Sequence, residues 1–351
     1  MTELPYATPE LPGSGGTLRG APEDFRVDEV PAYLPSGAGP HLYVRIEKRG
    51  RTTPDALRAM ARALGVPERD AGYAGLKDRD AVTTQWLSFP VARDPDPAAL
   101  EGPGLRVLEV SRHANKLRAG HVRANRFAIV VRGGDAAAAR AAAAALAGRG
   151  LPNFFGPQRF GRDGRNAGTG RAILLGERTP EAARAARDRF LRRLSISAYQ
   201  SLLFNRWLAA RMADGLFAAA LKGDVMKKLD TGGLFDCEDP AVDGPRVARF
   251  EISPAGPMFG HKLRPAAHDA LAREERLLAA EGIALSDFAR GRGEAEGTRR
   301  AARLRAEVAV EPLAEGGGYR ASFELPKGSY ATVVLRELTK SGAALAEPDE
   351  G

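Results

Sequence analysis

The chain has 351 residues, of which 44% are hydrophobic and 27% charged, and its formal net charge is +8. This length is sufficient for two domains with a sizeable core, and no apolar run approaches the roughly 20 residues that cross a bilayer. The single cysteine, Cys237, excludes an internal disulfide and a multi-cysteine metal cluster, and the five histidines show no metal-ligand spacing.

The N-terminal segment, residues 1–16, is rich in proline, glycine and threonine and is expected to be a loose lead-in. It lacks the basic and apolar regions of a secretory signal, which favours a cytoplasmic protein. In residues 18–29 a Pro-Glu-Asp turn precedes Phe25 and Val27, which alternate with charged residues as in a half-buried strand.

A polar stretch between two predicted elements holds the first candidate catalytic residues. His41–Lys48 predicts a strand, and Thr53 is the expected N-cap of a helix that ends at Gly65. Residues 74–85 then read Ala-Gly-Leu-Lys-Asp-Arg-Asp-Ala-Val-Thr-Thr-Gln, directly before an apolar strand over Trp86–Phe89. Crowded polar residues at a strand end are typical of an active-site loop held by a scaffold, although composition alone favours a solvated turn.

Two further strands are predicted over Val107–Val110 and Phe127–Val131, and an alanine-rich helix follows from Asp135 to Ala147. Gly148 or Gly150 is expected to end this helix. The basic residues between the strands either line an RNA groove or form a solvated edge, and they are Lys116, Arg118, His121, Arg123 and Arg126.

Residues 152–161 read Pro-Asn-Phe-Phe-Gly-Pro-Gln-Arg-Phe-Gly and form the second candidate site. Such a pattern suits an extruded nucleotide, because an aromatic face stacks on a base, an amide reads its polar edge and arginine holds phosphate. The alternative is that these aromatic side chains belong to the core, as we expect for Phe154 and Phe160.

The middle of the chain is expected to be mostly helical. Residues 160–180 indicate a loop, and helices are predicted from about residue 179, over Ala267–Ala280 and over Glu294–Arg305, with few strand signals around residues 223–233. An apolar stripe at helical spacing predicts core packing for Ile196, Tyr199, Leu203, Trp207 and Ala210.

Strand signals return at Val308–Val310, Ala321–Leu325 and Tyr330–Leu335, and a disordered tail is expected after Ser341. The order strand-rich, helix-rich, strand-rich predicts an α/β (α+β) protein. Its sheet domain would be built from both ends of the chain, with a helical segment inserted between them.

Separate stretches of the chain resemble motifs of the tRNA pseudouridine synthase D (TruD) family. They are Pro-Glu-Asp-Phe-x-Val-x-Glu from residue 22, Gly-Leu-Lys-Asp with Ala-Val-Thr and Gln from residue 75, the motif of residues 152–161, and Gly-Ser-Tyr-Ala-Thr-Val-Val-Leu-Arg-Glu-Leu from residue 328. The resemblance implies a pseudouridine synthase catalytic domain with a mixed, largely antiparallel sheet (residues 1–178 and 306–351) and a mostly helical TRUD insertion domain (residues 179–305).

The resemblance also implies roles for individual residues. Asp78 takes the place of the catalytic aspartate, and Arg19 takes the place of a lysine that accompanies it in relatives. Asp80 is a second carboxylate that chemistry alone would allow. The expected substrate-binding residues, with Tyr330 standing where the family usually has phenylalanine, are Arg19, Gln85, Asn153, Phe155, Gln158, Arg159 and Tyr330.

The implied activity is isomerisation of uridine, at position 13 of tRNA, to pseudouridine by an aspartate nucleophile. No cofactor and no metal are expected, and the expected enzyme is a cytoplasmic monomer that binds tRNA and no membrane. Two alternatives stay open. A non-catalytic RNA-binding protein would explain the charge, and a glycosidase-like hydrolase could use Asp78 and Asp80 as paired carboxylates.

Overall fold

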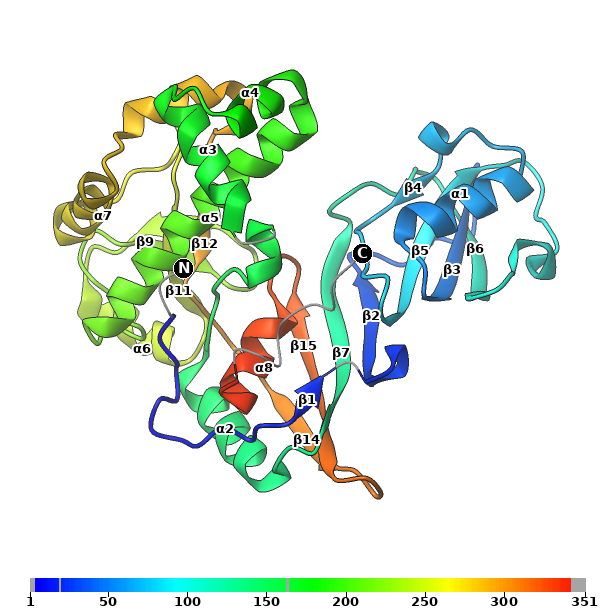
Figure 1. Ribbon diagram of the computed structural model, residues 1–351, viewed down its shortest axis with the longest axis horizontal. Helices are drawn as coiled ribbons and strands as arrows, with labels where there is room; N and C mark the ends of the chain where they lie inside the picture. The colour runs from blue at the N-terminus through cyan, green and yellow to red at the C-terminus, as the bar shows by residue number, and fades with distance from the viewer. Residues whose placement is uncertain (1–3, 19, 162–163, 342–351) are drawn as a thin grey trace. The chain divides into compact units, whose positions relative to one another are not determined.

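The computed structural model describes residues 4–18, 20–161 and 164–341. The chain forms two compact units, each assembled from separate segments (Figure 1). The sheet unit comprises Leu11–Ala144, Ala306–Ala331 and Leu338–Gly351, and the helix-rich unit comprises Met1–Glu10, Ala145–Arg305 and Thr332–Glu337.

A nine-stranded sheet forms the scaffold of the sheet unit, in the order β14-β15-β7-β2-β5-β3-β6, with β1 on β7 and β4 on β5. The pairing of β2 with β5 is parallel and the other pairings are antiparallel, which confirms the predicted mixed, largely antiparallel sheet. The strands are β1 (Thr17–Leu18), β2 (Phe25–Pro31), β3 (His41–Arg49), β4 (Gly72–Tyr73), β5 (Val82–Pro90), β6 (Leu105–His113), β7 (Val122–Arg132), β14 (Val308–Pro312) and β15 (Gly318–Pro326).

Alternation along β3 explains how one face of this sheet is covered. Leu42, Val44 and Ile46 share a face and pack against the helix α1 (Thr53–Ala63), whose Met60 is fully buried. The intervening Tyr43 packs with Trp86 in a separate cluster.

The start of α1 differs by one residue from the prediction. Thr52 is the N-cap, and its hydroxyl accepts the N–H of Asp55, while Thr53 is the first helical residue. Gly65, with a φ of 64°, follows the helix as predicted. The alanine-rich helix α2 (Ala136–Arg149) is confirmed and is followed by Gly150 at a φ of 85°.

The helix-rich unit contains a four-stranded sheet, β10-β9-β11-β12, beside its helices. The sequence does not predict this sheet, because its strands carry lysine and proline residues, which normally argue against strands. The elements are β8 (Leu151–Pro152), α3 (Arg165–Leu175), α4 (Pro180–Arg187), α5 (Arg189–Ala213), β9 (Val225–Lys228), β10 (Leu234–Asp236), α6 (Pro240–Ala248), β11 (Ile252–Met258), α7 (His268–Glu281), β12 (Thr298–Ala301), β13 (Arg303–Leu304) and most of α8 (Ala331–Thr339).

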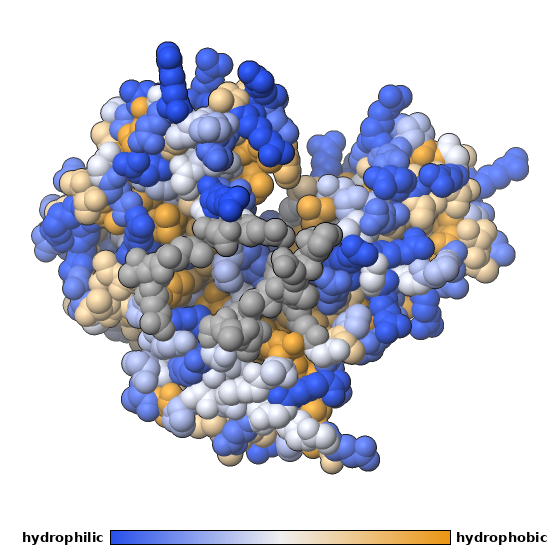
Figure 2. Space-filling model, in the orientation of Figure 1, coloured by the Kyte–Doolittle hydropathy of each residue, from blue (hydrophilic) through white to orange (hydrophobic). Residues whose placement is uncertain are grey.

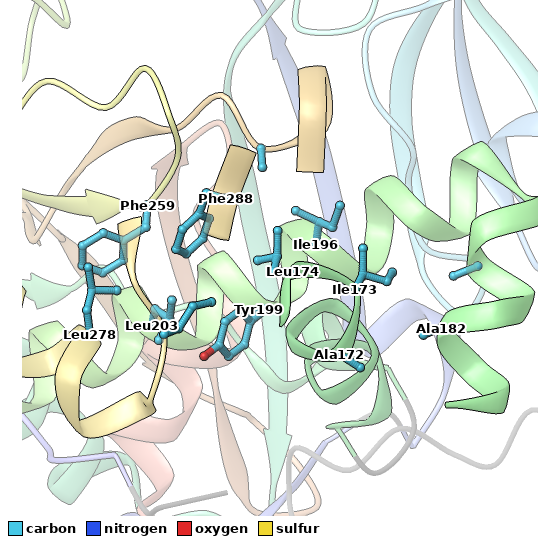
Figure 3. Packing of buried hydrophobic residues seen from close by; sticks show 13 residues of the cluster. Ala172, Ile173, Leu174, Ala182, Ile196, Tyr199, Leu203, Phe259, Leu278 and Phe288 are labelled. Carbon is cyan, nitrogen blue, oxygen red and sulfur yellow. The ribbon is translucent and has the colours of Figure 1, made fainter. Parts of the chain in front are cut away.

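The core of the helix-rich unit lies around α5, as Figure 3 shows. Ile196, Tyr199 and Leu203 of the predicted apolar stripe are buried there, against Leu174 of α3. Ala210, the last member of the predicted stripe, is exposed. Cys237 is buried, and burial raises the pKa of its thiol to about 12, as suits a structural residue.

Three predicted elements are wrong. Residues 160–180 contain the helix α3. Its glycines have a low helix propensity and argue for a loop, but Gly170 is needed because the Ser195 backbone of α5 approaches it closely. The predicted helix over Glu294–Arg305 is absent, and Thr298–Ala301 and Arg303–Leu304 in this range are strands, because pairing of β12 with β11 buries Arg299 against Glu274. The C-terminal stretch of residues 330–335 lies mostly in α8, which buries Val334, Leu335 and Leu338 at helical spacing.

Residues 4–16, the described part of the N-terminal segment, are also held more firmly than predicted. Thr8 is fully buried, and its hydroxyl donates to the Glu337 carboxylate at 3.1 Å. The Arg336 guanidinium lies 3.6 Å from the centre of the Tyr6 ring. The predicted tail after Ser341 lies outside the described residues. No described helix has the length and apolar character needed to span a membrane.

Candidate active site

The loop of residues 74–81 joins β4 to β5 and carries the candidate catalytic carboxylate. The Ala74 carbonyl at its start accepts the Gly120 N–H at 2.8 Å. Along the loop, Leu76 is 67% exposed and Asp78 is also exposed, whereas Ala81 is fully buried. The loop therefore presents its middle to solvent while both ends are fixed.

Thr53 and Gln85 hold the first half of this loop. The Thr53 hydroxyl accepts the Lys77 N–H at 2.9 Å and donates to the Gln85 side-chain oxygen at the same distance. The Gln85 amide donates at 3.4 Å to the Gly75 carbonyl. Since Thr53 is fully buried and Gln85 is 1% exposed, this arrangement is shielded from water. Gln85 thus supports the start of the loop that carries the candidate carboxylate.

Lys77 points inward, unlike its neighbour Asp78. Its side chain is 7% exposed, and its ammonium lies 2.5 Å from the Asn125 side-chain oxygen and 3.2 Å from the Glu29 carboxylate. Burial raises the pKa of Glu29, and the positive charge of Lys77 opposes that shift. Glu29 also accepts the Trp86 N–H at 3.4 Å, so the loop is tied to β2, β5 and β7.

Lys48 holds the second half of the loop from below. Its ammonium donates to the Asp78 carbonyl at 2.6 Å and to the Arg51 carbonyl at 2.7 Å. The residue is fully buried, and this burial lowers the pKa of its side chain to about 8. A buried lysine therefore fixes the backbone of Asp78 while leaving its carboxylate in solvent.

The Asp78 side chain is exposed to solvent, and its negative charge acts on the Lys48 ammonium, where it opposes the lowering of the Lys48 pKa by burial. Asp80 is partly exposed on the same loop. Arg19, the predicted companion of Asp78, lies outside the described residues.

Asn153 is held in the helix-rich unit by β12 and the residue after it. Its amide nitrogen donates to the Ala301 carbonyl at 2.9 Å, and its side-chain oxygen accepts from Arg300 at 2.5 Å. Its backbone N–H donates at 2.9 Å to the Ala302 carbonyl. These bonds fix the orientation of an amide that is 6% exposed.

Phe155 lies between Arg300 and α5. The Arg300 guanidinium is 4.0 Å from the centre of its ring, the Phe204 ring meets it edge to face at 5.7 Å, and 8% of Phe155 is exposed. The Asn205 amide holds its backbone through bonds of 2.8 and 2.9 Å. Phe155 is therefore rigidly placed, with a cation on one side of its ring.

Gln158 and Arg159 follow in a short 3-10 helix, Pro157–Phe160. Arg159 is held by the hydroxyls of Ser197 and Ser201 on α5, and its guanidinium lies 5.7 Å from the Phe155 ring centre. Gln158 is exposed and accepts weakly from Thr332 at 3.4 Å. As predicted, Phe154 and Phe160 are core residues, at 1% and 2% exposure.

Tyr330 is partly exposed and lies directly before α8, rather than on the predicted strand. The candidate residues thus form two local groups. The sheet unit holds Asp78, Gln85 and Tyr330, and the helix-rich unit holds Asn153, Phe155, Gln158 and Arg159.

Several supporting residues are not predicted by the sequence, because their signals are weak. The sequence pattern marks Lys48 and Thr53 only as strand and cap residues, and Asn125 stands in an unremarkable strand. Arg300 falls in a segment predicted as a solvated helix. Within the described parts of the chain, no group of three or more His, Cys, Asp or Glu side chains is placed to hold a metal ion.

Comparison with known proteins gives one family. The family model described as tRNA pseudouridine synthase D (TruD) matches residues 2–186 and 176–338. A curated relative from Anaeromyxobacter sp. (strain Fw109-5), named tRNA pseudouridine synthase D, is 80% identical over 350 residues and covers 100% of both chains. A relative of the same name from Thermus thermophilus is 45% identical over 340 residues, or 96% of this chain and 92% of its own.

A solved structure has the same fold. It is described as a putative tRNA pseudouridine synthase D from Methanosarcina mazei, and it superposes with a TM-score of 0.76 over 96% of each chain at 24% identity.

Proposed function

The chain belongs to the tRNA pseudouridine synthase D family, and on this premise we propose that it isomerises uridine, at position 13 of tRNA, to pseudouridine. The observation that carries the proposal is the way in which Asp78 is presented. Its backbone carbonyl is bound by the fully buried Lys48, whereas its carboxylate faces solvent. A reactive group held on a rigid support loses little order when it meets its substrate.

The proposed reaction breaks the N1–C1′ bond of the uridine, turns the base and joins C5 to C1′. The proton on C5 leaves to water and N1 gains one, so the reaction is redox-neutral and needs no coenzyme. Asp78 acts as the nucleophile, either by adding to C6 of the base or by stabilising positive character at C1′. We keep Arg19 as the residue proposed to accompany this carboxylate.

The other candidate residues bind the target nucleotide or support the site. Phe155 stacks on the extruded base and Asn153 contacts its polar edge, while Tyr330 closes the site. Arg300 lies against one side of the Phe155 ring and also donates to the Asn153 side-chain oxygen, so it holds both of these residues in place for the base. Gln85 supports the loop, and Arg159 and Gln158 support the nucleotide-binding segment.

We propose residues 1–178 and 306–351 as the catalytic domain and residues 179–305 as the TRUD insertion domain. The boundaries of these proposed domains are not those of the two compact units. The two divisions agree only in separating residue 305 from residue 306. The net charge of +8 supports tRNA as the partner. The proposed enzyme is a cytoplasmic monomer.

Tritium release from tRNA labelled at C5 of uridine tests the proposal, with the modified position mapped by primer-extension stops. We expect the wild type to release tritium and to produce a stop at position 13, and Asp78→Asn to abolish both. Asp80→Asn is the matched control, because it removes the other carboxylate of the same loop, and it should retain activity.

Each alternative has its own outcome in this experiment. A non-catalytic RNA-binding protein would release no tritium while still binding the tRNA. A glycosidase-like hydrolase would release free base and would lose activity in both aspartate variants.

A further inference from the structure

The last turn of α4 and the first turns of α5 form a solvent-facing surface of unusual composition. We call it the Arg–Phe surface, and it comprises Arg184, Arg187, Arg189, Phe190 and Arg193, all of which are exposed. Figure 2 shows hydrophilic side chains projecting where Figure 1 draws α4.

The core explains only the opposite faces of these two helices. Ala182 and Ala185 of α4 are buried in the core cluster, and Leu191 of α5 packs against it. Phe190, by contrast, is 72% exposed, so its ring contributes little to packing. Phe190 and Arg193 lie three residues apart on α5 and therefore share a face of the helix.

The arginines of this surface are not used in ion pairs that stabilise the fold. Within the described residues, Arg184, Arg187 and Arg193 have no acidic partner, and Arg189 is 94% exposed at 4.0 Å from Glu294. Arg192, which is not part of the surface, shows the contrast, because it binds the same Glu294 at 2.7 Å. The surface thus keeps positive charge available to a partner.

The helix α5 connects this surface to the candidate site. Its Ser197 and Ser201 hold Arg159, and its Asn205 holds the backbone of Phe155. Arg193 lies one turn before Ser197. Phe190 lies about 22 Å from Asn205 along the helix axis, at a rise of about 1.5 Å per residue. A polynucleotide that reaches Phe155 can therefore extend along α5 for a few nucleotides.

Resting on the proposed function, we propose that the Arg–Phe surface binds unpaired nucleotides of the RNA substrate. Phe190 stacks on a base and the arginines contact phosphates. An exposed aromatic ring among arginines is the combination with which proteins bind single strands, because every base offers a face for stacking. Inside a duplex both faces of a base are covered by its stacked neighbours, so the nucleotide bound by Phe190 must lie in an unpaired, unstacked part of the RNA.

Binding of a fluorescein-labelled, unmodified tRNA transcript to the full chain tests this proposal. The Asp78→Asn background prevents turnover during the measurement. We expect Phe190→Ala to raise the dissociation constant about tenfold without changing its salt dependence, since stacking releases no counterion. Arg193→Ala should lower the slope of log K against log salt by about 1. Phe190→Trp should bind the tRNA as tightly as the Asp78→Asn background, because tryptophan also stacks on a base. Phe190→Leu should bind as weakly as Phe190→Ala.

Two matched controls carry the same kinds of side-chain change on other exposed helices. Val242→Ala on α6 removes a side chain that is 62% exposed, and Arg62→Ala on α1 removes an exposed arginine; both should bind within about twofold of the background. The proposal is overturned if Phe190→Ala and Arg193→Ala also bind within about twofold, or if Phe190→Leu binds as well as phenylalanine.

Failure of the proposed function is recognised separately. In that case the chain with Asp78 intact releases no tritium from C5-labelled tRNA at saturating protein. The binding contrasts among the variants still decide whether this surface contacts RNA.

Discussion

At the scale of single residues, the candidate site separates the proposed catalytic carboxylate from the residues that hold its loop. Asp78 is exposed, whereas Lys48 and Gln85, which hold its loop, are at most 1% exposed. A lysine buried beneath a loop costs desolvation energy. Because Lys48 nevertheless donates to the carbonyls of Arg51 and Asp78, we infer that a fixed position of the Asp78 backbone is important for the site.

The first prediction concerns this buried lysine. We expect Lys48→Met to lower kcat about 100-fold with little change in tRNA affinity, because misplacement of a reactive group by about 1 Å has an effect of this size. Single-turnover kinetics and tRNA titrations measure the two quantities separately. An equal loss of affinity would contradict a positioning role, since Lys48 is fully buried and cannot touch RNA.

The pH dependence gives a second readout of the same residue. The pKa of Lys48 is lowered from 10.5 to about 8 by folding. Between about pH 8 and pH 10.5 the unfolded chain therefore binds more protons at this residue than the folded chain does. The contribution of Lys48 thus makes the free energy of unfolding rise with pH in this range. Activity should move in the opposite direction, since the ammonium that binds the Asp78 carbonyl is lost above about pH 8. A fall in activity that accompanies unfolding would exclude this explanation.

At the scale of elements, the sequence is sufficient where one period dominates. The alternation in β3 and the alanine-rich run of α2 predict both elements. In α8 the β-branched run Thr332–Val334 indicates a strand, and only the longer spacing that reaches Leu338 reveals the helix. Arg299 is buried by a partner distant in sequence, Glu274, which no local pattern predicts.

The same limit applies to the candidate site. Asp78, Asn153 and Phe155 stand in recognisable motifs, whereas Lys48 and Arg300 act through contacts that only the fold creates. Candidate site residues on loops can be recognised in the sequence because they stand in motifs. The buried residues that hold them have the sequence pattern of ordinary strand residues.

The second prediction concerns two glycines of α3. A Cβ at Gly170 would collide with the Ser195 carbonyl of α5, whereas a Cβ at Gly168 meets nothing within 4 Å. We expect Gly170→Ala to destabilise the chain by about 1–3 kcal/mol. Gly168→Ala should stabilise it by up to about 1 kcal/mol, because alanine loses less backbone entropy in a helix.

Urea unfolding followed by tryptophan fluorescence measures this difference. The chain has two tryptophans, Trp86 in the sheet unit and Trp207 in the helix-rich unit, so a Trp86→Phe background makes the signal specific for the unit that contains α3. Shifts of the same sign for both alanine variants would show that the α3–α5 packing does not depend on Gly170.

At the scale of the whole molecule, the two units depend differently on chain continuity. The core cluster around α5 and the four-stranded sheet of the helix-rich unit come from one stretch, residues 145–305. The sheet unit needs distant segments, because β15 pairs with β7 from Gly318–Arg132 to Pro326–Ala124. Without residues 306–331, β7 would expose an unpaired edge.

The third prediction follows from this asymmetry. We expect a fragment of residues 145–305 to fold alone and to melt cooperatively, with Trp207 in a buried environment. A fragment of residues 11–144 should aggregate or remain unfolded, since it loses the strands beyond β7, and a peptide of residues 306–331 added in trans should rescue it. Circular dichroism and fluorescence melts measure both outcomes.

Cooperative folding of residues 11–144 without the peptide would mean that β14 and β15 are accessory to the sheet. An unfolded 145–305 fragment would mean that the helix-rich unit depends on the terminal contacts of Thr8 and Glu337.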